Sequence, residues 1–211
     1  MKRFAFTMLE LVFVIIVIGI LAVLAMPSFT SNPLQRAAEQ VAGHIRYTQH
    51  LAMVDDQFDP TDPTWFMKKW QIRFRENNND LYYAVYSDKN KNRNINCNAT
   101  TCDEPAMDPL TKQPLYYLAS RANNSMILST QYSITDVNVS CDTPDSSLYT
   151  TSLGALSFDH LGRPYNGIGN NTAGLYDFLL QANCNIVLRH PDGNATITVA
   201  PETGYVSISY N

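Results

Sequence analysis

The sequence predicts an α+β protein in which one long N-terminal α-helix packs on a globular domain built from an antiparallel β-sheet. Three observations predict this class: an apolar run near the start, an amphipathic stretch after it, and short β-rich runs separated by turn residues. The chain has 211 residues, 45% of them hydrophobic and 16% charged, so it can bury a core. A formal net charge of -4 excludes the class of globally basic proteins that coat nucleic acid.

The first element is an apolar run of 21 residues from Phe6 to Met26, in which Glu10 is the one ionisable residue. At about 1.5 Å per helical residue, such a run covers roughly 30 Å, the thickness of the hydrocarbon core of a bilayer. Lys2 and Arg3 precede the run and favour a cytoplasmic N terminus. We therefore expect a transmembrane helix over residues 6–26, with the rest of the chain across the membrane.

Glu10 is unusual in this setting, because a carboxylate costs about 2.5 kcal/mol or more at the centre of a membrane helix and marks a partner or a function. The alternative interpretation of the run is a secretory signal peptide cleaved after Val23-Leu24-Ala25. A signal peptide needs an apolar region of only about 7 to 15 residues. The length of the run and the acid at its start therefore disfavour this alternative.

The junction between the basic leader and the apolar run reads AFTMLE over residues 5–10. This motif resembles the class III signal of type IV pilins and type II secretion pseudopilins, although that family usually has Gly where this chain has Ala5. The resemblance implies that a prepilin peptidase cuts between Ala5 and Phe6 and that Phe6 becomes N-methylated. It also implies that Glu10 neutralises the terminal ammonium of a neighbouring filament subunit, which lowers the cost of burying either charge alone.

A second helix is expected after the apolar run. Pro27 should kink or loosen the first helix, because proline removes an intrahelical hydrogen bond, and pilins have a proline at the matching place. Beyond it, apolar residues recur at steps of three and four and predict an amphipathic helix over residues 34–53 that is half buried against the globular domain. The expected apolar face comprises Leu34, Ala38, Val41, Ile45, Thr48 and Ala52.

Short β-rich runs follow the helix. Residues 70–74 and 81–86 flank the turn residues 77–80 and predict a hairpin. The β-rich runs at residues 195–199 and 205–210 flank a Pro-Glu-Thr-Gly turn. They predict a C-terminal hairpin with Ile197, Val199, Val206 and Ile208 buried. Further strands are predicted at residues 133–140, 155–158, 185–189, 195–199 and 205–210.

Two stretches of the C-terminal half extend the resemblance. FDHLGRP at residues 158–164 and TITVAPETGYVSI at residues 196–208 are similar to the H-type minor pseudopilins and related minor pilins, the GspH/FimT group. The implied organisation is a leader at residues 1–5, an assembly helix at 6–26, an amphipathic helix at 27–53 and a periplasmic β-rich domain at 54–211. Residues 88–153 align with no part of that family.

The resemblance implies a subunit of a short periplasmic filament in a type II secretion system or a type IV pilus-like machine for protein export. Its partners would be the prepilin peptidase, other pseudopilins or pilins, and an inner-membrane assembly platform. The protein would be a single-pass inner-membrane protein of a bacterium. Two alternatives remain: a minor pilin of a DNA-uptake system that contacts DNA, and a membrane-tethered periplasmic binding module.

Four cysteines lie beyond the apolar run, and an even number in an exported domain suggests disulfides. Three pairings exist. We favour Cys97 with Cys102, which closes a short polar loop, and Cys141 with Cys184, which ties two strands together. A zinc site is disfavoured, because the spacing lacks a matching second pair and a nearby His.

The basic stretch of the chain falls between residues 68 and 93, where seven basic residues and three acids are interleaved with aromatic residues. The resemblance to DNA-uptake pilins implies phosphate contacts and base stacking there. The alternative is a strand with arginines on its solvent face and aromatics in the core. The candidate DNA contacts are Lys68, Lys69, Arg73, Arg75, Lys89, Lys91 and Arg93.

Other candidate sites are weak. Alternating oxygen side chains at residues 88–94 resemble the start of a calcium loop, but the sixth-position Gly and the twelfth-position acid are missing, so we expect no metal. Asn138 and Asn194 follow an acid by two residues and match the bacterial N-glycosylation pattern.

Asp159 and His160 are disfavoured as an acid–base dyad, because neighbours in a strand point to opposite faces. We expect neither an enzyme nor a cofactor, and we place His44 and His50 on the surface of the amphipathic helix.

Overall fold

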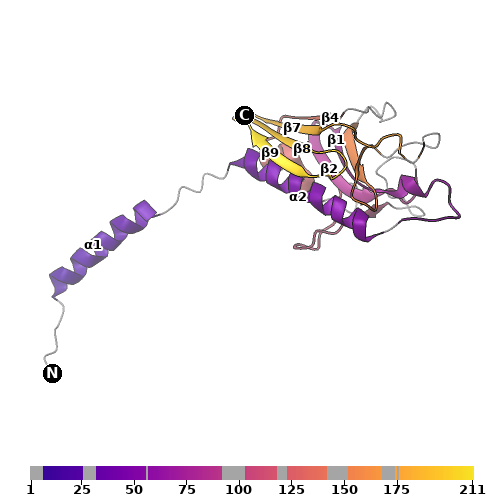
Figure 1. The fold of residues 1–211 in the computed structure, drawn as a ribbon. Helices are drawn as coiled ribbons and strands as arrows, with labels where there is room; N and C mark the ends of the chain where they lie inside the picture. The colour runs from indigo at the N-terminus through magenta and orange to yellow at the C-terminus, as the bar shows by residue number, and fades with distance from the viewer. Residues whose placement is uncertain are drawn as a thin grey trace, which may run out of the picture. The chain divides into compact units, whose positions relative to one another are not determined.

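The structure is a computed structural model that describes residues 7–25, 32–55, 57–91, 103–117, 123–141, 152–167, 174 and 176–211 (Figure 1). The chain divides into two compact units, Met1–Ser31 and Asn32–Asn211. The second unit contains helices and two antiparallel sheets. The predicted α+β class with antiparallel strands is therefore confirmed.

The first unit contains one helix, α1, which spans Met8–Ala25. Thr7 precedes it, and the Thr7 hydroxyl accepts a hydrogen bond from the backbone N–H of Glu10 at 3.3 Å. This contact satisfies one of the backbone donors that every helix start leaves unpaired. Within the described residues, no helix combines the length and the apolarity that a membrane span requires.

The second unit begins with α2, which spans Pro33–Val54 and matches the helix expected at residues 34–53. The Asn32 side chain accepts a hydrogen bond from the backbone N–H of Gln35 and caps the helix, and Pro33 suits the first helical position because its missing N–H is not needed there. The predicted apolar face is confirmed, with Ala37 and Ala42 as further members. The buried residues of this face are Leu34, Ala37, Ala38, Val41, Ala42, Ile45, Thr48 and Ala52.

A five-stranded sheet has the order β3-β2-β1-β5-β6. Its centre is the predicted hairpin, in which β1 and β2 pair from end to end through a turn where Asn78 and Asn79 both have positive φ. This turn geometry matches the right-handed twist of the paired strands, and Asn tolerates it well. The strands span Trp70–Asn77 (β1), Asp80–Ser87 (β2), Glu104–Pro105 (β3), Ser152–Phe158 (β5) and Pro164–Asn166 (β6).

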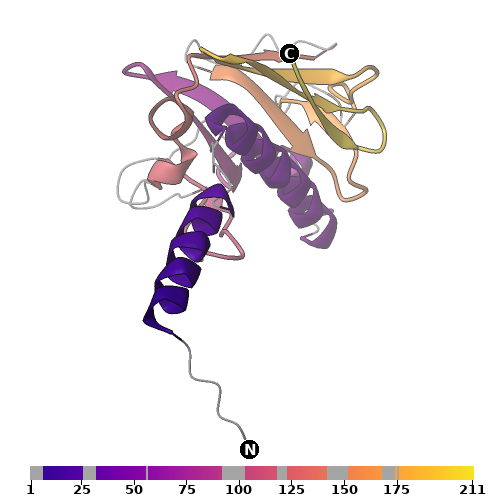
Figure 2. The same ribbon diagram turned by 90° about the vertical axis from the view of Figure 1, so that its left-hand side faces the viewer.

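A four-stranded sheet has the order β4-β7-β8-β9. It includes the predicted C-terminal hairpin, where Ile197, Val199 and Val206 are buried and Ile208 is partly buried against the core. The strands span Asp136–Ser140 (β4), Cys184–His190 (β7), Gly193–Val199 (β8) and Val206–Tyr210 (β9). Helix α2 contacts strands of both sheets, so it closes one core between them (Figure 2).

In the described part of the chain, short helices that the sequence pattern did not predict are η1 at Trp65–Lys68, η3 at Asn124–Met126 and α3 at Leu128–Tyr132. The strand expected at residues 133–140 begins at Asp136, because α3 ends at Tyr132 and Ser133 caps it in the left-handed conformation. A Cys141–Cys184 disulfide is present, as expected. It joins the residue after β4 to the first residue of β7. Cys97 and Cys102 lie outside the described residues.

Two side chains lie deeper than expected. Arg73 was assigned to a solvent face, but it is only 1% exposed, because the face of β1 and β2 that carries it is also covered. Tyr86 on that face contacts the ring of Tyr116, with ring centroids 6.2 Å apart. His44 was expected on the helix surface, yet it contacts Tyr83 of β2. His50 is exposed, in agreement with the expectation.

Candidate functional site

The N-terminal candidate residues are only partly placed. Ala5, Phe6 and Pro27 lie outside the described residues. Glu10 lies in the first turn of α1, three residues after the Thr7 cap. A Thr followed three residues later by Glu is also the sequence of a capping box, so the residue types at positions 7 and 10 suit a helix start as well.

The expected basic patch does not form a free cationic surface. Lys68 pairs with Asp62 at 3.2 Å, and Lys91 pairs with the same carboxylate. Lys89 pairs with Glu104 at 3.0 Å.

The remaining candidate DNA contacts fit no better. Arg73 and Lys69 are buried, and Arg75 is half buried. Arg93 lies outside the described residues. The expectation of a phosphate-contacting hairpin is therefore corrected for Arg73 and Lys69, whose side chains lie too deep to contact a DNA backbone.

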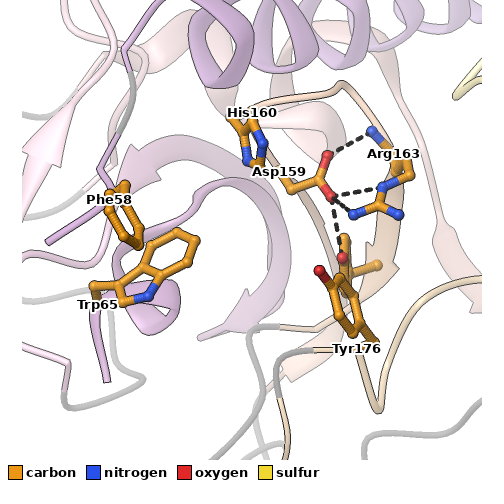
Figure 3. A pocket seen from close by; sticks show the side chains of 7 residues that line it. Phe58, Trp65, Asp159, His160, Arg163 and Tyr176 are labelled. Carbon is orange, nitrogen blue, oxygen red and sulfur yellow. Dashed lines mark hydrogen bonds and ion pairs between the residues drawn. The ribbon is translucent and has the colours of Figure 1, made fainter. Parts of the chain in front are cut away.

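The candidate site of the second unit, Asn32–Asn211, is a pocket of about 370 Å³ (Figure 3). One wall comes from Phe58 and Trp65, in the segment between α2 and β1, and the other from the turn after β5 and from Tyr176. Pockets of this size with aromatic walls and a few polar groups are typical of ligand sites. The lining residues are Phe58, Trp65, Asp159, His160, Arg163, Tyr165 and Tyr176.

Asp159 organises the polar side of the pocket, and it is only 5% exposed. Its Oδ1 accepts hydrogen bonds from the backbone N–H groups of Leu161 and Arg163, both at 3.0 Å. Its Oδ2 accepts from the Arg163 guanidinium at 2.8 Å and from the Tyr165 hydroxyl at 3.0 Å. Burial alone would raise the pKa of this carboxyl, but the hydrogen bonds and the charge of Arg163 outweigh it and lower the pKa.

Arg163 links this network to Tyr176, on the same wall of the pocket. Its side chain is partly exposed, and its guanidinium carbon lies 5.2 Å from the centroid of the Tyr176 ring. This is a cation–π distance. The arrangement therefore presents an aromatic face and a guanidinium on the same side of the pocket, and the buried Asp159 holds the guanidinium.

Lys69 lies beneath the pocket, between η1 and β1, and it is 7% exposed. Its Nζ lies 3.5 Å from the centroid of the Tyr165 ring. Burial lowers the pKa of Lys69 to about 8, while the charge of Asp159 opposes this shift and that of Arg163 adds to it. The pocket therefore has a buried ammonium in its neighbourhood that titrates near neutral pH.

Helix α2 holds the turn that carries these residues. The Gln49 side chain donates hydrogen bonds to the carbonyl oxygens of Gly162 and Thr203, both at 2.8 Å. Gly162 has a φ of 79°, which favours glycine, and a Cβ at this position would lie 3.1 Å from the Gln49 amide nitrogen. A single side chain thus fixes both the pocket turn and the β8–β9 turn to the helix.

The sequence missed this site for a specific reason. Asp159 and His160 were treated as strand neighbours, but β5 ends at Phe158 and both residues lie in the following turn and line the pocket. The argument that strand geometry separates them was therefore wrong. The signal that could have found the turn was Asp159-x-x-Gly162, because Asp starts turns and Gly accepts positive φ.

Other expected sites have mixed outcomes. Asn138 and Asn194 are exposed on β4 and β8, and their glycosylation stays a prediction. The calcium-like loop is only partly described, and there Asn90 donates to Asp103 at 3.0 Å. Across the described part of the chain, no cluster of three His, Cys, Asp or Glu side chains could hold a metal ion.

Comparisons with known proteins assign no family to this chain. No protein-family model, no curated protein and no solved structure matches the chain. The class that the structure defines is an α+β protein with one exposed apolar helix and an aromatic pocket in its folded unit. Any narrower assignment is a proposal.

Proposed function

We propose that this protein is a pilin-like subunit that assembles through its N-terminal helix into a short periplasmic filament of a protein-secretion machine. The observation that supports this proposal best is the exposure of the apolar side chains of α1. Large apolar residues are exposed along its described length, at Met8, Leu9, Leu11, Val12, Phe13, Val14, Ile15, Ile16, Ile18, Ile20 and Leu21.

An apolar surface of this extent is unstable in water, at about 25 cal/mol per Å² of apolar area. It therefore calls for a covering environment, which is a bilayer before assembly and neighbouring helices in a filament. The apolar run in the sequence extends from Phe6 to Met26, and both of its ends lie outside the described residues. The Cys141–Cys184 disulfide is consistent with a periplasmic location, where oxidising conditions let disulfides persist.

In this proposal a prepilin peptidase cuts between Ala5 and Phe6, Phe6 is methylated, and Glu10 pairs with the terminal ammonium of the next subunit. The partners are other pseudopilins or pilins and the inner-membrane assembly platform. Mass analysis of the N terminus of membrane-extracted protein tests the first step. A terminus at methylated Phe6 supports the proposal, whereas a terminus at Met1 or Met26 contradicts it.

Substitutions of Glu10 test the assembly step and separate it from helix capping. Glu10→Gln keeps a side chain that suits a capping box but removes the charge, whereas Glu10→Leu removes both. A filament subunit should lose assembly in both variants and keep membrane insertion. Filament content is measured by cross-linking of neighbouring subunits in intact cells. Normal assembly of Glu10→Gln would show that the charge has no partner.

A second function is favoured by the aromatic pocket, namely a membrane-tethered periplasmic binding module. Such a protein uses the apolar segment only as an anchor, so it should tolerate Glu10→Leu without loss of ligand binding or localisation. The DNA-uptake alternative gains no comparable support, because the basic side chains around the β1–β2 hairpin are buried or paired with acids where they are described.

A further inference from the structure

The pocket adjoins a buried cation, the ammonium of Lys69. Within the described part of the chain, the Lys69 ammonium contacts the rings of Tyr165 and Phe66, at 3.5 and 5.9 Å from their centroids, and no oxygen accepts a hydrogen bond from it. A side chain that is 7% exposed normally needs an acceptor, since ring contacts replace only part of the lost hydration. The ammonium is therefore suited to an anionic group that arrives from outside.

A small cavity lined by Lys69, Asp55 and Gln57 shares three lining residues with the pocket. It has a volume of about 20 Å³, and Trp65, Asp159 and His160 line both it and the aromatic pocket. A cavity of this size holds one water-sized group, because a single water needs at least about 10–15 Å³. One oxygen atom of a ligand in the pocket fits there, whereas a phosphate group with its four oxygens does not.

The polar groups of the pocket are donors. The Asp159 oxygens already accept from two backbone N–H groups, from the Arg163 guanidinium and from the Tyr165 hydroxyl, so this carboxylate has no lone pair to offer a ligand. The guanidinium has five N–H donors, more than Asp159 uses. A ligand that supplies acceptors and negative charge therefore fits better than one that supplies donors.

The same geometry disfavours a cationic ligand. Aromatic pockets often bind cations, but here the rings of Tyr165 and Tyr176 already lie against Lys69 and Arg163. A ligand cation would meet two resident cations. An uncharged carbohydrate would gain no ion pair with Arg163 or Lys69, so an anionic ligand fits these two side chains better.

The walls are shaped for a ring. Phe58 and Trp65 meet edge to face, with centroids 5.2 Å apart and planes at 80°, so a third ring can stack on one and meet the edge of the other. Phe58 and Tyr176 are each 58% exposed at the two sides of the pocket (Figure 3). These exposed aromatic faces are the surface that a bound ring would cover.

We propose that the pocket binds a carboxylate carried by an aromatic body, the chemistry of an N-acylated aromatic amino acid. The ring lies against Phe58, Trp65 and Tyr176, and the carboxylate lies between Arg163 and Lys69. The ligand is either a free small molecule or the C-terminal residue of a peptide, because both carry this group. This site does not depend on the filament role of the N-terminal helix.

Calorimetric titration of the full chain in detergent micelles tests the proposal, with N-acetyl-L-phenylalanine as the probe and its neutral amide as the control ligand. The carboxylate should bind about tenfold or more tightly than the amide, because it gains charge-assisted hydrogen bonds. Lys69→Met should remove this difference, Lys69→Arg should retain part of it, and Lys112→Met, on an exposed side chain, should leave it unchanged. Circular dichroism establishes that each variant is folded.

Further ligands distinguish the sources and the competing chemistries. Tighter binding of Gly-Gly-Phe than of N-acetyl-L-phenylalanine identifies a peptide C terminus, and the reverse identifies a small molecule. Three results would overturn the proposal: equal binding of acid and amide, an unchanged preference in Lys69→Met, or equally tight binding of glucuronate or of an oligothymidylate that competes with the probe.

Discussion

The hydroxyl of Tyr83 lies 2.7 Å from Nδ1 of His44, and this contact joins the middle of α2 to β2. The Gln40 amide donates to the same hydroxyl at 2.7 Å. Tyr132 in turn donates to the Gln40 carbonyl oxygen. Burial lowers the pKa of His44 to about 4, against the opposing charge of Asp108, and so favours the neutral imidazole in this network.

His44 should make the stability of the folded unit depend on pH. Its pKa is lower in the folded chain, so between about pH 6.5 and pH 4 the unfolded chain binds more protons and stability falls as the pH falls. The loss should be at most about 3 kcal/mol. Urea unfolding at a series of pH values measures it, and His44→Gln should flatten the curve in this window. An identical curve for both proteins would contradict the assignment.

Lys69→Met should stabilise the protein. The pKa of Lys69 is lower in the folded chain, at about 8 against an ordinary 10.5, so burying its charge costs stability at pH 7 and the cost fades as the pH rises from 8 to 10.5. The gain at pH 7 should be about 1–3 kcal/mol by urea unfolding and should disappear near pH 10. Lys112→Met provides the matched control and should change little. A destabilised Lys69→Met would show that the ammonium is well paired.

Asp159→Asn should be strongly destabilising, because it removes one partner of a buried ion pair that also accepts three other hydrogen bonds. We expect a loss of about 3–5 kcal/mol in the free energy of unfolding. Asp136 offers the comparison, since its pair with Arg189 is exposed at both ends. Asp136→Asn should therefore cost less than about 1 kcal/mol. Equal losses for the two variants would refute the structural role of Asp159.

Reduction of the Cys141–Cys184 disulfide should also lower stability. The bridge spans 43 residues of sequence, and a closed loop of this size contributes up to about 4 kcal/mol by restricting the unfolded chain. The double variant Cys141→Ala and Cys184→Ala should show this loss in urea unfolding with and without reductant. Breaking this bridge with reductant should lower the free energy of unfolding of the unsubstituted protein. The double variant lacks the bridge and should show no such loss from it. Equal stability of oxidised and reduced protein is the opposing result.

Local patterns in the sequence were sufficient for the elements that bury one face. The steps of three and four in α2 placed its apolar residues on one side, and the alternation of Ile197 and Val199 placed both in the core. The β1–β2 turn was visible in its Asn residues. These features depend on neighbours within a few residues, so periodicity and turn chemistry encode them directly.

Such local patterns could not predict the pocket, because its walls come from distant parts of the chain. Phe58 and Tyr176 are more than a hundred residues apart, and only the packing of β5 beside β1 brings the Asp159 turn close to Trp65 and Lys69. Arg73 was misassigned for the same reason, since alternation along a strand does not show whether its second face is covered. Chain order and periodicity are local properties, whereas burial, ion pairing and the meeting of an aromatic wall with a buried cation arise only when the sheets close around α2.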